Sequence, residues 1–139
     1  MATRSNIGIV NEDGSVTGIY VHWDGYPSHV GRILLTNYNT NDLVNKLIGG
    51  GNISSIGENT DTDLPHSFDK PVAGVCVYYN RDRGESGNEP EKFVSLTEFQ
   101  MHGHDSGADY QYLFENGKWM YRKHDGTWNE LTARVCKCD

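Results

Sequence analysis

The chain has 139 residues, the length of one ordinary domain, and such a domain buries about two thirds of its unfolded surface around one core. Its formal net charge of −7 argues against broad contact with a nucleic-acid backbone, which requires many lysines and arginines. There is no signal-peptide pattern and no apolar run of the ~18 residues that a membrane span needs. Cys76, Cys136 and Cys138 are too few for a disulfide framework, so we expect a cytoplasmic domain with free thiols.

Two short β-prone segments open the chain, Ser5–Asn11 and Ser15–His22. Asp13-Gly14 lies between them and supplies the positive φ that a tight turn requires, so the pattern predicts a β-hairpin. In Trp23-Asp24-Gly25-Tyr26-Pro27, glycine and proline alternate with aromatic residues, which indicates a structured loop after the second strand.

Two helices are predicted between residues 28 and 49. Ser28 is the expected N-cap of the first helix and Thr40 that of the second, which Gly49 ends. The residues expected to face the core are Val30, Ile33, Leu34 and Tyr38 in the first helix, and Leu43, Val44, Leu47 and Ile48 in the second.

The middle of the chain is expected to be irregular. Residues 52–69 carry four carboxylates and no lysine or arginine, so we predict a polar loop over residues 52–71. Its expected anchors are Ile53, Ile56, Leu64 and Phe68. The nearly continuous apolar run Val72–Tyr79 predicts a central strand that is buried on both faces, followed by a charged loop at Arg81–Pro90.

The last third of the chain predicts one helix and a β-meander. Ser95-Leu96-Thr97-Glu98 has the spacing of a capping box, which favours a short helix ending near Met101. Tyr110–Glu115 and Lys118–Lys123 flank Asn116-Gly117, a strong hairpin pattern, and Thr127–Leu131 is the expected last strand. The whole pattern predicts one α+β domain over residues 1–139. Its sheet would be mainly antiparallel, built from an N-terminal β-hairpin, a central strand and a C-terminal β-meander, with two or three short helices.

Two segments are candidate ligand-binding sites. The loop with His22, Trp23, Asp24 and Tyr26 brings a base, a carboxylate and two aromatic rings to the end of a predicted strand, where functional side chains are common. In the alternative interpretation, the rings pack over the edge of the core and the two polar side chains bond to the turn.

The second candidate segment is Arg81-Asp82-Arg83-Gly84-Glu85, which follows the predicted central strand. Its two guanidinium groups have the geometry to grip a phosphate or a carboxylate in a bidentate manner. In the alternative interpretation, Arg81 and Arg83 pair instead with Asp82, with Glu85 or with the acidic segment 52–69.

Metal and catalytic motifs are weak in this sequence. His102-Gly103-His104-Asp105 looks like part of the His-x-His-x-Asp-His motif of metallo-β-lactamase-type hydrolases, but Asp105 directly follows His104 and the next histidine is missing. We therefore expect a solvated polar loop there. Cys136-Lys137-Cys138 with His124 offers only a weak soft-metal site. Phosphate-loop, nucleophile-elbow and dinucleotide-binding motifs are lacking, so we expect no catalytic residue, no cofactor and no metal.

Distinctive short segments are spread over residues 4 to 119, most of the chain. They are Arg4-Ser5-Asn6-Ile7-Gly8, Tyr20-Val21-His22-Trp23-Asp24-Gly25-Tyr26-Pro27, Gly31-Arg32-Ile33-Leu34-Leu35 with Tyr38-Asn39-Thr40, Ile53-Ser54-Ser55-Ile56-Gly57, Arg81-Asp82-Arg83-Gly84-Glu85, and Tyr112-Leu113-Phe114-Glu115-Asn116-Gly117-Lys118-Trp119. In these segments the chain resembles a family of small uncharacterised proteins encoded by bacteriophages and prophages. The resemblance implies action in the cytoplasm of the bacterial host and implies no particular chemistry.

Three functions fit these observations. Small phage accessory proteins often act by binding, so the first is a non-enzymatic inhibitor of a host defence or other host protein complex, acting through acidic and aromatic surface. The second is a nucleotide-signal sponge, in which Arg81 and Arg83 hold phosphate while Trp23 or Tyr26 stacks on a base. The third is a small metal-dependent hydrolase that uses His22, Asp24, His102 and His104. An exposed aromatic face on the C-terminal meander would also suit a homo-oligomer.

Overall fold

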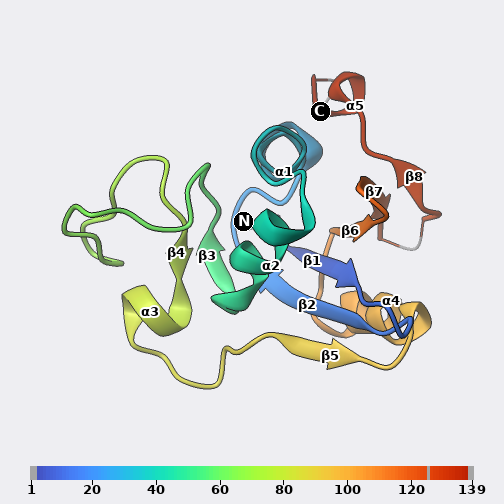
Figure 1. Ribbon diagram of the computed structural model, residues 1–139, viewed down its shortest axis with the longest axis horizontal. Coiled ribbons are helices and arrows are strands. Elements are labelled where there is room, and N and C mark those ends of the chain that lie inside the picture. Colours follow the sequence, from blue (N-terminus) through green and yellow to red (C-terminus); the bar gives the residue numbers. More distant parts are fainter. Residues whose placement is uncertain (1–2, 125, 138–139) are drawn as a thin grey trace.

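A computed structural model describes residues 3–124 and 126–137, which form one mixed sheet of eight strands with helices packed against it (Figure 1). The strands are β1 (Ser5–Val10), β2 (Val16–Val21), β3 (Ile53–Ser55), β4 (Val77–Tyr78), β5 (Glu91–Phe93), β6 (Tyr110–Glu115), β7 (Lys118–Lys123) and β8 (Asn129–Glu130). The helices are the π-helical turn η1 (Pro27–Gly31), α1 (Arg32–Asn37), α2 (Asn41–Gly49), α3 (Tyr79–Arg83), α4 (Leu96–Asp105) and α5 (Ala133–Lys137).

The sheet order is β4-β3-β2-β1-β6-β7-β8, and β5 pairs with β2 outside this path. The pairs β1–β6 and β2–β3 are parallel and the other pairs are antiparallel, so the predicted α+β class with a mainly antiparallel sheet is confirmed. The described residues contain more helices than the two or three expected. No helix in this part of the chain is long and apolar enough to cross a membrane.

The two faces of the central strands are covered by different helices. Because side chains alternate along a strand, Ile7 and Ile9 face the larger core, which they share with residues of η1, α1 and α2 such as Val30, Leu34 and Leu47. The opposite face has a smaller cluster, in which Phe99 of α4 packs with residues of β2, β5 and β6. The helices that cover the larger core can be followed in Figure 1.

Both predicted hairpins are confirmed. In the first, β1 pairs with β2 from Ser5–Val21 to Val10–Val16, and Gly14 in the turn has a φ of 85°. In the second, β6 pairs with β7, and the two turn residues Asn116 and Gly117 have φ values of 51° and 78°. Positive φ at both central positions is the requirement of the tight turn that Asn-Gly predicts.

The helix predictions need two corrections. The Thr40 side chain accepts a hydrogen bond from the backbone N–H of Leu43, as an N-cap should, but the Leu43 side chain is exposed instead of facing the core. The first helical segment begins at Pro27 after Tyr26, so Ser28 lies inside its first turn and is not the N-cap. Proline suits the first helical position because its missing N–H has no partner there.

The prediction of a central strand at Val72–Tyr79 is wrong. Only Val77–Tyr78 is a strand, and it lies at the edge of the sheet next to β3. Gly74 adopts a φ of 79°, which interrupts an extended chain. The apolar residues from Val75 to Tyr78 are nevertheless buried, and Cys76 and Tyr78 belong to the larger core, where Tyr78 donates to the carbonyl oxygen of Leu47 in α2.

Three further expectations are corrected. The segment Arg81–Pro90 begins inside α3 and becomes a loop only after Gly84. Helix α4 starts at the predicted cap Ser95 but continues to Asp105, so residues 102–105 lie on its last turn and not in a loop. Leu64 is 63% exposed and Phe68 is 38% exposed, so these two side chains do not anchor the loop, whereas Ile53 and Ile56 are buried.

Candidate functional site

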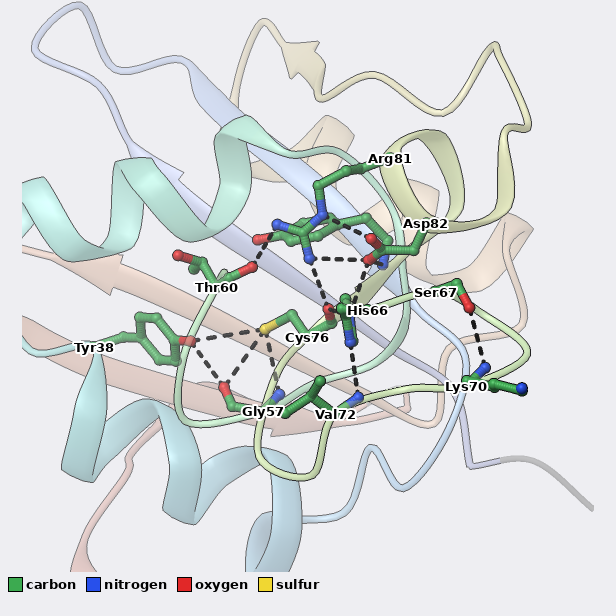
Figure 2. Close-up of polar contacts among 11 residues, drawn as sticks. Tyr38, Gly57, Thr60, His66, Ser67, Lys70, Val72, Cys76, Arg81 and Asp82 are labelled. Carbon is green, nitrogen blue, oxygen red and sulfur yellow. Dashed lines mark hydrogen bonds and ion pairs between the residues drawn. The ribbon is translucent and has the colours of Figure 1, made fainter. Parts of the chain in front are cut away.

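Three side chains join the long loop between β3 and β4 to helix α3. They are His66 from the loop and Arg81 and Asp82 from α3, and we call them the anchor network (Figure 2). The side chains of His66 and Asp82 are 6% and 3% exposed, whereas that of Arg81 is 41% exposed. The network therefore has a buried centre and one solvent-facing member.

Asp82 is the centre of the anchor network. Nε and Nη2 of Arg81 donate to its two carboxylate oxygens at 2.8 and 2.9 Å, and the backbone N–H of Tyr78 donates to Oδ2 at 2.8 Å. Burial acts to raise the pKa of Asp82, but these hydrogen bonds and the charge of Arg81 outweigh it, so the pKa lies below its usual value. Asp82 is thus held as a carboxylate.

His66 is bound on both ring nitrogens. The backbone N–H of Val72 donates to Nδ1 at 2.9 Å, so the ring proton lies on Nε2, which donates to the carbonyl oxygen of Cys76 at 3.0 Å. Nε2 also lies 3.4 Å from Oδ2 of Asp82. The imidazole therefore bridges two parts of the backbone and contacts the carboxylate.

Arg81 completes the attachment of the loop. Its Nη1 donates to the carbonyl oxygen of Thr60 at 2.6 Å, and its Nη2 donates to that of Cys76 at 3.0 Å. The backbone N–H of Phe68 donates to the carbonyl oxygen of Asp82 at 3.1 Å. The loop is thus held at Thr60, His66 and Phe68, close to both ends of its acidic part.

Below the anchor network, Cys76 is fully buried. Its Sγ accepts from the backbone N–H of Gly57 at 3.3 Å and lies 3.7 Å from the hydroxyl of Tyr38, which donates to the carbonyl oxygen of Gly57. Burial raises the pKa of the Cys76 thiol, so it is neutral at physiological pH and poorly nucleophilic. His66 contacts the carbonyl oxygen of Cys76, and the geometry is not that of a thiolate–imidazole pair.

Arg83 is also engaged within the protein. Its Nε lies 3.0 Å from Oε1 of Glu85, and its guanidinium carbon lies 4.4 Å from the centre of the Phe68 ring and 5.8 Å from that of Tyr79. Arg81 and Arg83 therefore pair with Asp82 and Glu85, as the alternative interpretation of the sequence proposed. Most of the donors of Arg81 serve the protein's own acceptors.

The loop with His22, Trp23, Asp24 and Tyr26 is well ordered by hydrogen bonds. Nδ1 of His22 lies 2.8 Å from the hydroxyl of Tyr20, and its ring meets that of Trp23 edge to face at 4.7 Å. The Tyr26 hydroxyl donates to Asp24 at 3.1 Å. Desolvation, and then the positive charge of Arg4, lower the pKa of His22. Trp23 is exposed, so the loop presents one ring to solvent.

Strand β3 lies between the two segments that the sequence singled out. Ile53 of β3 pairs with Val21 at the end of β2 on one side and with Tyr78 at the end of β4 on the other. Since β2 runs parallel and β4 antiparallel to β3, the His22 loop and helix α3 leave the sheet in opposite directions. The two segments therefore start on either side of Ile53 and extend away from each other.

Metal-ligating side chains are scattered in the described ranges. Among residues 3–124 and 126–137, no three or more histidine, cysteine, aspartate or glutamate side chains are grouped to hold a metal ion. His104 stacks on His124 with ring centres 5.5 Å apart. Cys138 lies outside the described residues, so the geometry of the Cys136–Cys138 pair is not described.

The sequence did not point to His66, to Thr60 or to the exposure of the loop that they hold. We call residues 58–70 the acidic loop. In Figure 1 the segment between β3 and β4 projects at one end of the molecule, away from α1 and α4. The loop exposes the side chains of Leu64 and Phe68, and it carries the carboxylates Glu58, Asp61, Asp63 and Asp69.

Comparison with protein-family models, curated proteins and solved structures found no match.

Proposed function

We propose that this protein acts by binding another protein through the acidic loop, as a phage-encoded, non-enzymatic inhibitor of a host defence or other host protein complex in the bacterial cytoplasm. The observation that supports the proposal most strongly is the combination of a loop held by buried polar contacts with apolar side chains that remain exposed on it. The resemblance to phage proteins supports the choice of a host target.

A held loop binds at lower entropic cost than a mobile one. Ordering a side chain or a loop segment upon binding costs about 0.5–1.5 kcal/mol per immobilised side chain, and attachment before binding avoids part of that cost. Bonds made by Thr60, His66 and Phe68 fix the acidic loop to α3 and to Cys76, the residue before β4. The backbone N–H of Lys70 donates to the hydroxyl of Ser67 and so shapes the far end of the loop. The loop therefore resembles a preformed recognition element.

The surface chemistry of the loop defines the partner. Leu64 and Phe68 offer apolar anchors, and the neighbouring carboxylates Asp61, Asp63 and Asp69 are all exposed. Oδ2 of Asp61 lies 3.7 Å from Nζ of Lys46, and such an exposed ion pair contributes little to stability. Complementary charges steer association and apolar anchors supply affinity. The expected partner thus presents an apolar pocket surrounded by lysine and arginine.

The proposal is tested by capture from lysate of a bacterium that hosts related phages, followed by binding measurements with the purified partner. The test variant is L64S/F68S. Its matched control is V94S/M101S, which removes two exposed apolar side chains elsewhere on the surface. We expect the loop variant to lose at least tenfold in affinity, the control to bind like wild type, and the wild-type affinity to fall as salt is raised.

Equal binding by the two variants would contradict a role for the acidic loop, provided that circular dichroism and melting temperature show both to be folded. Recovery of no specific partner by a folded, monodisperse protein would contradict the binding function itself.

A further inference from the structure

A cavity of about 270 Å³ lies outside the site described above. It is formed by β2, by the C-terminal half of α4 and by the segment that leads into β5. This volume is close to the lower end of the range for ligand-binding clefts, roughly 300–1,000 Å³. The lining residues are Gly18, Ile19, Tyr20, Asn52, Gly87, Glu89, Glu91, His102 and Ser106.

One side of the cavity is rigidly built. The backbone N–H of Asn52 donates to the backbone carbonyl oxygen of Asn88 at 2.8 Å. The side-chain Nδ2 of Asn52 donates to the side-chain Oδ1 of Asn88 at 3.1 Å. The Asn52 side-chain oxygen also accepts the backbone N–H of Tyr20 at 2.9 Å. Asn52 therefore joins β2 to the segment that carries Glu89 and Glu91.

The cavity is lined by two carboxylates, and the cation Arg4, which is not itself a lining residue, lies near Gly107 beside Ser106. Within the described chain, neither Glu89 nor Glu91 makes a side-chain hydrogen bond or ion pair. Arg4 is located by two observations: a Cβ on Gly107, next to Ser106, would lie 3.1 Å from its Nη1, and its charge acts on both Tyr20 and His22. In the same described ranges the Arg4 guanidinium makes no hydrogen bond, because the bonds of Arg4 are all made by its backbone N–H, to Asp109, and by its carbonyl oxygen, to the N–H groups of Asp109 and Tyr110.

Two aromatic side chains also line the cavity. Tyr20 lines the cavity, and its hydroxyl is fixed by Nδ1 of His22 at 2.8 Å. His102 lines it as well, and its ring packs on Phe93 with centres 4.9 Å apart. Rings that are held in place by such contacts are suitable for stacking on a flat ligand.

We propose that this cavity binds a nucleoside monophosphate, with the base or sugar donors at Glu89 and Glu91, the flat base against Tyr20 or His102, and the phosphate at Arg4. Carboxylates accept hydrogen bonds from base amino groups and sugar hydroxyls, and a guanidinium binds phosphate through two parallel hydrogen bonds. The site uses none of Arg81, Arg83 and the acidic loop, so it is independent of the proposed protein binding.

The test is a thermal-shift measurement, followed by calorimetry, with AMP, GMP, CMP and UMP. Each nucleotide is compared with its nucleoside and with inorganic phosphate. All are used at about 1 mM, which is of the order of the Kd expected for a weak ligand. At least one monophosphate is expected to raise the melting temperature more than its nucleoside or phosphate does. R4Q should lower the affinity for that nucleotide about tenfold and leave the affinity for the nucleoside unchanged. E91Q should lower the affinity for both.

The matched control is R32Q, which removes an exposed arginine on α1, the helix that covers the other face of the sheet. It should bind the nucleotide like wild type. No shift with any of the four monophosphates would overturn the proposal, as would equal effects of R4Q and R32Q. Stabilisation by L-arginine, without a nucleotide effect, would overturn it in favour of an amino-acid site. The melting temperatures of the unliganded variants verify that each is folded.

Discussion

Gly8 and Gly18 lie directly opposite each other across the β1–β2 hairpin, and the ring of Phe99 packs against both. A Cβ on Gly8 would lie 2.9 Å from Cζ of Phe99, and one on Gly18 would lie 2.8 Å from its Cε1. The absence of two side chains on this face of the sheet thus makes room for α4, which in turn forms part of the cavity near Ser106.

We predict that Gly18→Ala destabilises the protein by about 1–3 kcal/mol, the usual cost of overpacking a well-filled core. The added methyl group would meet Phe99 and also lie 3.3 Å from the carbonyl oxygen of Ile7. Urea denaturation gives the free energy of unfolding. Gly49→Ala is the control: its Cβ would meet nothing within 4 Å, so stability should stay level or rise by up to ~1 kcal/mol. An unchanged midpoint for Gly18→Ala would show that α4 can move away.

Asp82→Asn should lower the free energy of unfolding by about 2 kcal/mol, because charged hydrogen bonds to Arg81 are replaced by weaker ones. It should also make the acidic loop more sensitive to limited proteolysis, since Asp82 organises the side chains that hold it. Glu85→Gln, which removes only the exposed partner of Arg83, should change stability by less than ~0.5 kcal/mol. Equal proteolysis of both variants would argue against the anchoring role.

Local patterns predicted the parts of this fold that depend on neighbouring residues. The hairpin at Asn116-Gly117 and the caps at Thr40 and Ser95 are each decided within a few residues, and all three are present. The place of Val77–Tyr78 in the sheet depends instead on long-range pairing with β3, which a local apolar run does not encode. The same run is buried at an edge because Cys76 and Tyr78 pack into the core that α1 and α2 share.

Only part of the anchor network could be predicted from the sequence. The pairing of Arg81 with Asp82 follows from adjacency, and it was one of the two interpretations of that segment. His66 is a single histidine in a polar stretch, without periodicity or motif, so its burial against Asp82 required the tertiary structure. The sequence gives no sign of a role for Arg4, because its nearness to Gly107 depends on how β1 meets the chain before β6.

Cys76 should resist alkylation in the folded protein. Its side chain is inaccessible, and burial raises the pKa of the thiol, so little reactive thiolate forms. We expect peptide mapping after iodoacetamide treatment at pH 8 to show Cys76 unmodified in native protein and fully modified in urea. Rapid modification of the native Cys76 peptide would mean that the segment between β3 and β4 opens readily, which would also weaken the case for a preformed recognition loop.

Stability should depend on pH through Asp82. Its folded-state pKa lies below the value of about 3.9 for an unfolded chain, so its contribution is complete above that value and is lost as pH falls through the folded-state pKa. The stability difference between wild type and Asp82→Asn should therefore be constant from pH 7 to pH 5 and shrink between pH 4 and pH 2. Urea midpoints across this range measure it. Asp63→Asn, which changes an exposed carboxylate of the same loop, should differ from wild type by less than ~0.5 kcal/mol throughout. A difference for Asp82→Asn that persists unchanged to pH 2 would mean that the neutral carboxyl group holds the loop as well as the carboxylate does.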